Sequence, residues 1–156
     1  YHYFKEAFYD SKSVFAVETG IVAQARITKG IWFQPAVTWE LSGSNTDAGI
    51  LRMQSLNPQA ALLFTLNKPE PGYPAIYLIT GGFYRFNFAA TESGSSIDLT
   101  TKYYKTEPGI KFGFGLQSRN LQMDFGYKYG LTKVNKIETD GDVFTRGSYF
   151  SWTRFF

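Results

Sequence analysis

Charged side chains recur at alternate positions inside otherwise apolar segments of this chain, and they are its first candidates for chemistry. Acids and bases are nearly balanced among them. If their segments enclose a narrow interior, these groups must pair, because an isolated buried charge is very costly. The arrangement predicts a salt-bridged polar network that fills the interior, with a narrow ion or proton path as the functional alternative. The residues are Glu18, Arg26, Glu40, Arg85, Glu107, Lys111, Asp124 and Lys128.

Residues for nucleophilic catalysis are sparse. The sequence holds one histidine, His2, close to its first residue. A Ser/His/acid constellation needs a base that is oriented by a third group and lies within hydrogen-bond reach of the nucleophile, and no neighbouring motif supplies one. We therefore expect a non-enzymatic protein with no catalytic residue and no cofactor.

Two further patterns could hold ions. The segment Glu138–Asp142 places three acids around a glycine, and oxygen-rich loops of this kind can hold calcium, but it lacks the spacing of a full calcium loop. Gly81-Gly82 and the pair Gly113 and Gly115 could suggest phosphate cradles, yet neither opens onto a helix. We favour a solvated loop and close packing within strands, and calcium or another loop ligand stays the alternative.

The elements that must position the charged side chains are β-strands. In Leu121–Thr132, apolar and aromatic residues alternate strictly with polar residues or glycine, and Ile110–Gln117 repeats the pattern. Such alternation is typical of a strand with two unlike faces. Eight strands are predicted, at Tyr1–Tyr9, Val14–Ile27, Ile31–Leu41, Gln54–Leu66, Ala75–Ala89, Tyr103–Gln117, Leu121–Thr132 and Arg146–Phe156.

Strand length and composition favour a membrane barrel. The longest apolar run, Ala60–Phe64, is far short of the ~20 residues that a membrane-spanning helix needs, whereas most predicted strands reach the ~9–11 residues of a tilted membrane strand. In hydrocarbon, a β-structure pairs all its backbone groups only by closing into a barrel. We predict an all-β fold, a closed antiparallel up-and-down transmembrane β-barrel of eight strands, as a single domain over residues 1–156.

The predicted connections alternate between short and long. Short turns are expected at 29–30, 67–74 and 118–120, and long polar loops at 42–53, 90–102 and 133–145. Transmembrane barrels place short turns on the periplasmic side and long loops outside. Pro35, Pro58 and Pro108 fall inside predicted strands, on the apolar face. Because proline removes a ladder hydrogen bond, we expect them at strand ends or bulges near the barrel rims.

Aromatic residues make up 19% of the chain, well above an ordinary soluble domain. Trp39, Trp152 and Phe156 are predicted to lie at the membrane interface, where amphipathic rings gather at the headgroups. Trp32 falls on the inward parity and is expected to pack in the interior instead.

Overall composition excludes one class of partner. The formal net charge is +3, and the 16 lysines and arginines are scattered rather than clustered, so there is no footprint for nucleic acid. The absence of cysteine fits a cell-envelope protein without disulfides, and a cytosolic protein equally. The chain begins at Tyr1 without a leader segment, from which we expect a processed product.

Several strand-like stretches together resemble the PorT-like outer-membrane β-barrel family of Bacteroidota, over roughly residues 31–156. They are Gln34–Trp39, Leu56–Pro58 followed by Leu62–Phe64, Tyr77–Tyr84, Pro108–Gly115 and Tyr127–Val134. Phe150, Trp152 and Phe156 share one parity and resemble the C-terminal strand signal of outer-membrane proteins. The resemblance implies the outer membrane of a Gram-negative bacterium, a barrel of about eight strands and no shared enzymatic activity. Some members resemble accessory parts of secretion, assembly or uptake complexes.

The sequence therefore predicts a small non-catalytic outer-membrane β-barrel that serves as a structural or accessory subunit. Its expected partners are outer-membrane lipid and a larger outer-membrane protein, without a small-molecule substrate. Two alternatives remain. A soluble lipocalin-like barrel would bind a small apolar ligand inside and requires the aromatic parity to face inward. A lipid-modifying barrel enzyme would require His2, or a serine near a strand end, to be essential.

Overall fold

The computed structural model describes residues 2–5, 12–13, 17–46, 49–67, 73–99, 104–118, 120–132 and 144–155. Among these residues all strands belong to one antiparallel sheet, and no helix is long and apolar enough to span a bilayer. The strands are β1 (His2–Lys5), β2 (Lys12–Ser13), β3 (Val17–Val22), β4 (Ala25–Thr28), β5 (Ile31–Thr46), β6 (Gly49–Thr65), β7 (Ala75–Glu92), β8 (Ser95–Ser96), β9 (Thr106–Ser118), β10 (Leu121–Gly130) and β11 (Phe144–Arg154).

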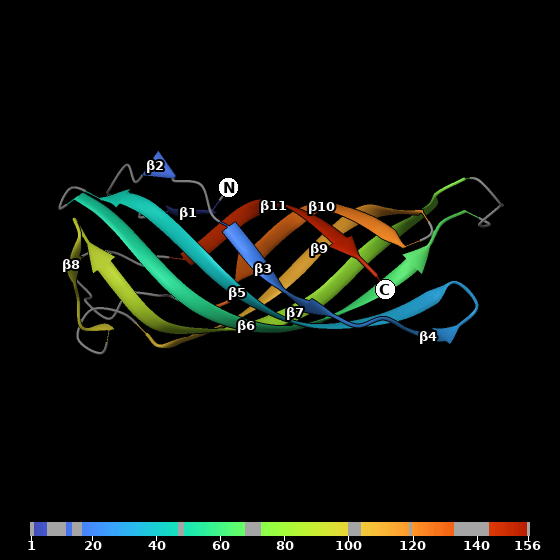
Figure 1. The fold of residues 1–156 in the computed structure, drawn as a ribbon, viewed down its shortest axis with the longest axis horizontal. Coiled ribbons are helices and arrows are strands. Elements are labelled where there is room, and N and C mark those ends of the chain that lie inside the picture. The colour runs from blue at the N-terminus through green and yellow to red at the C-terminus, as the bar shows by residue number, and fades with distance from the viewer. Residues whose placement is uncertain are drawn as a thin grey trace.

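The sheet has the order β1-β11-β10-β9-β7-β6-β5-β2, with β3 and β4 also on the edge of β5 and β8 on β7. It curls strongly into an open half-barrel (Figure 1). The predicted all-β antiparallel fold is confirmed. Closure is not seen in the described part of the chain, because the predicted first strand supplies only His2–Lys5 to the edge of β11.

Two predicted outer loops are wrong in extent. β5 and β6 continue through the predicted loop 42–53 and pair up to Thr46 opposite Gly49, so most of this segment is a hairpin. β7 likewise runs on to Glu92, turns at Ser93-Gly94 with positive φ at both residues, and returns as β8. On β6 the two faces exchange polarity there, because Leu51 and Met53 are buried inside while Arg52 is exposed, so the apolar outward pattern ends although the ladder continues.

Each proline inside a strand coincides with an interruption of one ladder. The carbonyl of Pro35 accepts from the N–H of Ala23, at the break between β3 and β4, and the β6–β7 ladder skips Pro58. The carbonyl of Pro108 accepts from Leu131, just past the end of β10. In an antiparallel sheet the N–H and C=O groups of one residue point to the same adjacent strand. The N–H group that each proline lacks would therefore point to a place where the ladder is already interrupted.

Burial alternates along the strands in the inverse of the usual soluble pattern. On β7 the outward residues from Ile76 to Phe88 are mostly exposed apolar side chains, whereas the inward Arg85 and Asn87 are buried. On β9 the exposed Phe112 and Phe114 alternate with inward residues. The outer wall is therefore apolar and aromatic, while the interior carries most of the buried polar groups.

The interior is layered along its length. At the end near the β5–β6 hairpin, an apolar cluster consists of Leu51, Met53, Ala90 and Leu99, with Ile97 against it. At the end near the short turns, a second cluster consists of Ala61, Leu63, Tyr77 and Ile79, with Trp32 packed on it as its parity suggested. Along β7, Arg85 lies between these two clusters, whereas Asp124 lies at the level of Tyr77, across Gly115.

Inward glycines make room for large inward side chains on neighbouring strands. A Cβ on Gly109 would collide with the ring of Phe83, and one on Gly115 would collide with Tyr77 and with Asp124. Gly81-Gly82 and Gly113 likewise lie within continuous strands. These glycines therefore serve close packing between strands, and no phosphate cradle is formed.

Candidate functional site

The centre of the interior is a network that we call the ionic core, made of Glu18, Glu40, Arg85, Glu107 and Lys128. Arg85 from β7 donates from Nη1 to Glu107 Oε2 at 2.7 Å, and its Nη2 lies 3.0 Å from Glu40 Oε1. These three side chains are at most 4% exposed. One guanidinium thus holds two carboxylates from strands on either side of it, through the charge-assisted hydrogen bonds that are among the strongest in proteins.

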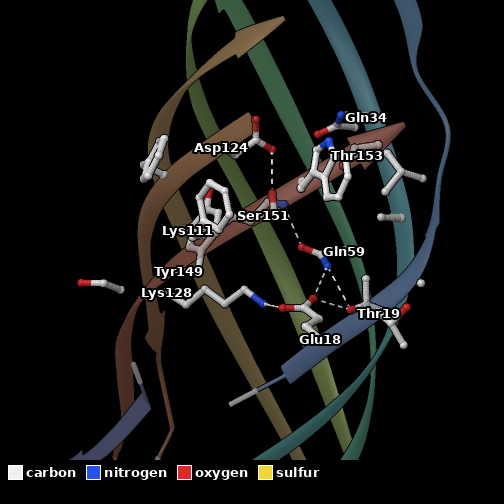
Figure 2. Close-up of a pocket in the computed structure, with 18 residues that line it drawn as sticks. Glu18, Thr19, Gln34, Gln59, Lys111, Asp124, Lys128, Tyr149, Ser151 and Thr153 are labelled. Atoms are coloured by element: carbon white, nitrogen blue, oxygen red, sulfur yellow. Dashed lines mark hydrogen bonds and ion pairs between the residues drawn. The ribbon is translucent and has the colours of Figure 1, made fainter. Parts of the chain in front are cut away.

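Lys128 extends the ionic core across the open side of the sheet. Its ammonium forms an ion pair with Glu18 on β3 and lies 3.9 Å from Glu40 Oε2. Figure 2 shows Lys128 and Glu18 pointing toward each other from the two sides of the interior. Asn57 adds a hydrogen bond from Nδ2 to Glu40 Oε2 at 2.9 Å. The curl of the sheet therefore brings β3 and β10 into contact although no ladder joins them.

Asp124 is the centre of a second polar group, closer to the short-turn end. Tyr77 donates its hydroxyl to Oδ1, Gln122 donates to both carboxylate oxygens at 3.0 and 2.9 Å, and Ser151 donates to Oδ2 at 3.2 Å. Asp124 therefore has several neutral hydrogen-bond donors around it. This satisfies a buried carboxylate without a direct ion pair.

Lys111 is held between these two groups. Its ammonium donates to Gln59 Oε1 at 2.7 Å, and Gln59 in turn donates to Glu18 Oε1 at 2.8 Å. The ammonium groups of Lys111 and Lys128 lie 6.0 and 5.8 Å from the ring centroid of Tyr149, within the range of cation–π attraction. Amides and an aromatic ring thus connect the predicted charged residues into one continuous polar interior.

Arg26 is the predicted network residue that the structure places elsewhere. It is exposed on β4, near the turn to β5, with its guanidinium 5.8 Å from the ring centroid of Trp32. Its Nε donates to the carbonyl of Thr28 at 3.4 Å. β4 is at the far end of the β3–β4 edge from Glu18, so inward parity alone did not bring Arg26 to the ionic core.

The predicted interface aromatics lie on the outer face where they are described. Trp152 is 70% exposed, and Trp39 points outward between the buried Thr38 and Glu40. Phe156 lies outside the described residues, as do the segment Glu138–Asp142 and the side chain of His2.

A cavity of about 630 Å³ opens beside the ionic core, between β3 and the later half of β11. Its polar lining comes from strands on both sides of the open edge (Figure 2). The lining includes Glu18, Gln34, Lys111, Asp124, Tyr149 and Ser151. A cavity of this size is large enough for ordered water or a peptide side chain, and its walls combine these polar side chains with apolar ones such as Val22, Phe150 and Trp152.

The charged groups of the ionic core are engaged with one another and with neighbouring amides. Among the residues that the structure describes, no group of three or more His, Cys, Asp or Glu side chains is placed to hold a metal ion. The carboxylates of the ionic core are engaged by Arg85, Lys128, Asn57 and Gln59. Charges committed to one another in this way stabilise a fixed arrangement of the strands.

Sequence reasoning missed three members of the interior. Tyr77, Gln122 and Tyr149 lie on the inward parity. Tyr77 and Tyr149 are aromatic, like the residues expected to face lipid, and Gln122 is an uncharged residue beside the charged Asp124. The available signal was glycine on the adjacent strand, because Gly115 lies directly opposite Tyr77 and Gly126 directly opposite Tyr149. A glycine opposite an aromatic residue indicates that the ring folds over the neighbouring strand.

Comparison with known proteins found no matching family model, no matching curated protein and no matching solved structure.

Proposed function

We propose that this chain is a small, non-catalytic outer-membrane β-barrel that acts as a structural or accessory subunit of a larger outer-membrane complex, of the secretion, assembly or uptake kind. The observation that carries the proposal is the inverted burial of the sheet. Phe112, Phe114 and Phe150 are more than half exposed on the outer wall, whereas Arg85 and Glu107 are buried inside. In water, an apolar outer wall around a charged interior is unfavourable because it exposes apolar side chains to solvent. In a bilayer, the same arrangement is expected because the outer wall contacts lipid.

The outer wall has the dimensions that a bilayer requires. The apolar outward residues of β7 run from Ile76 to Phe88. At ~3.3 Å per residue and a strand tilt of ~40°, this stretch covers about 30 Å along the barrel axis, close to the ~25 Å apolar band of membrane barrels. Neighbouring rings continue the wall sideways: Phe125 lies 5.7 Å from Phe114 and 4.9 Å from Phe150 between ring centroids.

Closure into a barrel belongs to the same proposal. Each unpaired backbone N–H or C=O group in hydrocarbon costs several kcal/mol of free energy. A few such groups are therefore sufficient to prevent insertion into the membrane. A half-barrel with an apolar outer wall therefore needs its two free edges covered before it is stable in a membrane. The outer membrane of a Gram-negative bacterium, as the PorT-like resemblance implies, is the location we propose.

The interior favours a supporting role over transport. Two apolar clusters flank the ionic core along β6 and β7, and the charges of the core are paired. A barrel of about eight strands is only wide enough to be filled by side chains. Loops, turns and the outer wall are then the surfaces left for function, and they suit contact with a protein partner.

The two alternatives are less well supported. A lipocalin-like barrel needs an apolar interior for its ligand, but the inward residues beside the cavity include Glu18, Lys111 and Lys128. No described residue favours a lipid-modifying enzyme, and an altered lipid profile after deletion of the gene would be its signature.

Fractionation and affinity purification test the proposal. We expect the tagged protein to stay in the membrane pellet after an alkaline carbonate wash, and to elute in mild detergent with one larger outer-membrane protein in stoichiometric amount. Elution alone as a detergent-bound barrel contradicts the accessory role. Recovery in the soluble fraction contradicts the membrane assignment itself.

A further inference from the structure

Acidic side chains are concentrated on the inner face of the sheet. In the part of the chain whose side chains the structure describes, two acids lie outside the interior, Glu92 and Asp98. Both belong to the β7–β8 hairpin and the residues after it, past the end of the apolar outward row of β7 at Phe88. The acids that face the interior are Glu18, Glu40, Glu107 and Asp124.

Basic side chains lie at both ends of the apolar outer wall. We call the end near the turns at 29–30 and 118–120 the short-turn rim, and the opposite end the loop rim. At the short-turn rim the bases are Arg26, Lys29 and Arg154, all exposed. At the loop rim they are the exposed Arg52 and Lys105 and the half-buried Arg146. Each rim therefore carries positive charge, while the acids lie inside the sheet.

Strand β11 shows this arrangement along a single row of side chains. Phe150 and Trp152 are 60% and 70% exposed on its outer face, and Arg146 and Arg154 lie on the same parity on either side of them. At ~3.3 Å per residue the two arginines are about 26 Å apart along the strand, or about 20 Å along the barrel axis at a tilt of ~40°. Because long arginine side chains extend toward the membrane interface, this spacing fits the ~25 Å apolar band of membrane barrels.

Each of these arginines has an aromatic neighbour of the kind that gathers at lipid headgroups. Arg146 donates from Nη2 to the hydroxyl of Tyr129 at 2.6 Å, and its Cζ lies 4.3 Å from the centroid of that ring. Trp152 is the outward residue next to Arg154 on β11. A guanidinium that stacks on a ring is held in one plane, and its planar fork of N–H donors matches the oxygens of a phosphate. Both rims therefore combine an interfacial aromatic ring with a phosphate-binding group.

We propose that the two rims bind the phosphate groups of anionic membrane lipids, with Arg146 as the contact at the loop rim and Arg154 as the contact at the short-turn rim. This rests on the proposed membrane location, and it adds the class of lipid that surrounds the protein. Basic residues close to a bilayer are attracted to anionic headgroups, and arginine binds phosphate through two parallel hydrogen bonds. The positive charge of the rims is complementary to lipids with a net negative charge, and zwitterionic lipids lack that charge.

Lipid titration followed by native mass spectrometry tests the preference. The purified protein in a mild neutral detergent is titrated with phosphatidylglycerol, which is anionic, or with phosphatidylcholine, which is zwitterionic. We expect phosphatidylglycerol to bind more tightly. The variant R146M/R154M should raise the apparent dissociation constant for phosphatidylglycerol about fivefold, as expected for the loss of one basic residue at each site, and should leave that for phosphatidylcholine unchanged.

Two matched variants separate charge from a general change of the wall. Ser148 is exposed and uncharged between the two arginines on the same face, so S148M should keep the affinity of the wild type. R146K/R154K keeps both charges and should recover most of the affinity that R146M/R154M loses. Equal binding of the two lipids by the wild type, or wild-type affinity for phosphatidylglycerol in R146M/R154M, would overturn the proposal.

Ionic strength provides a second test that needs no variant. In about 1 M salt the screening length is ~3 Å, so the affinity of the wild type for phosphatidylglycerol should fall to that for phosphatidylcholine. A preference that salt leaves unchanged would also overturn the proposal. Fractionation distinguishes this failure from the failure of the proposed function. A protein in the membrane fraction without the lipid preference refutes the lipid contacts alone, whereas a protein in the soluble fraction refutes the membrane location.

Discussion

Arg85 on β7 and Glu107 on β9 lie directly opposite each other in the sheet and form a buried ion pair at 2.7 Å. The same guanidinium lies 3.0 Å from Glu40, so one cation balances carboxylates from two other strands. A buried ion pair of this kind contributes little to the free energy of unfolding compared with well-packed apolar side chains in its place. Removal of one partner alone, however, leaves an uncompensated buried charge. The core is therefore most sensitive to changes that unbalance it.

Replacement of Arg85 by methionine should destabilise the fold strongly. R85M leaves Glu40 and Glu107 without their shared cation, and we expect a loss of about 3–5 kcal/mol in the free energy of unfolding. Urea unfolding in detergent, followed by tryptophan fluorescence, measures it. The variant R85M/E40Q/E107Q removes the charges together and should regain much of the loss. A loss below about 1 kcal/mol for R85M would show that the core is not energetically important.

Replacement of Lys128 by methionine should loosen β3. The ion pair between Lys128 and Glu18 is a contact that holds β3 across the open side. We expect amide exchange in Val17–Val22 to accelerate about tenfold, equivalent to about 1.4 kcal/mol. The control K105M removes an exposed lysine and should leave exchange in β3 unchanged. Equal exchange in both variants would contradict a role for Lys128 in holding β3.

A charge on the outer wall should interfere with membrane insertion according to its depth. Phe112 lies in the middle of the apolar row of β9, and F112R should cost about 2–4 kcal/mol of stability in lipid vesicles. Leu131 lies just past the end of β10, and L131R should cost about 0–1 kcal/mol. Equilibrium folding into vesicles measures both. Equal costs at the two positions would argue against a bilayer around this wall.

Filling the space above Gly115 should distort the Asp124 group. A Cβ at this position collides with Tyr77 and Asp124. We therefore expect G115A to reduce the free energy of unfolding by about 1–3 kcal/mol. Gly82 is the matched control, because its added Cβ would meet its nearest neighbour at 3.6 Å, an ordinary contact. G82A should therefore leave the denaturant midpoint unchanged or slightly raised. A similar midpoint for the two variants would show that Tyr77 does not depend on the glycine.

The protein should not conduct ions. The charges of the ionic core are paired with one another, and apolar clusters flank them along β6 and β7, so we expect the interior to be closed to ions. We expect no unitary currents from the purified protein in a planar bilayer under an applied voltage, with a general porin as positive control. Discrete current steps that disappear when the protein is omitted would favour the ion-path alternative.

Period-two alternation was enough to predict an all-β antiparallel sheet and several of its inward charges, although not the place of Arg26 or the inward Tyr77 and Tyr149. Once one face of a strand is known to be apolar, the other face follows, because neighbouring side chains point to opposite sides. Glu40, Arg85, Glu107, Lys111, Asp124 and Lys128 were assigned inward in this way, and they line the interior. The hairpin at 42–53 escaped prediction because its apolar residues Leu51 and Met53 face the interior, opposite to the apolar face of the neighbouring strands.

The sequence by itself determined that this protein is a sheet with an apolar outer wall and a charged interior, since both properties depend only on neighbouring residues. Only the tertiary structure decided which charges pair. Glu18 and Lys128 are 110 positions apart in the chain, and their contact depends on the curl of the whole sheet. The register of β1 against β11, with His2 opposite Gly147, was likewise beyond the sequence pattern, because it is set between strands that lie far apart in the chain.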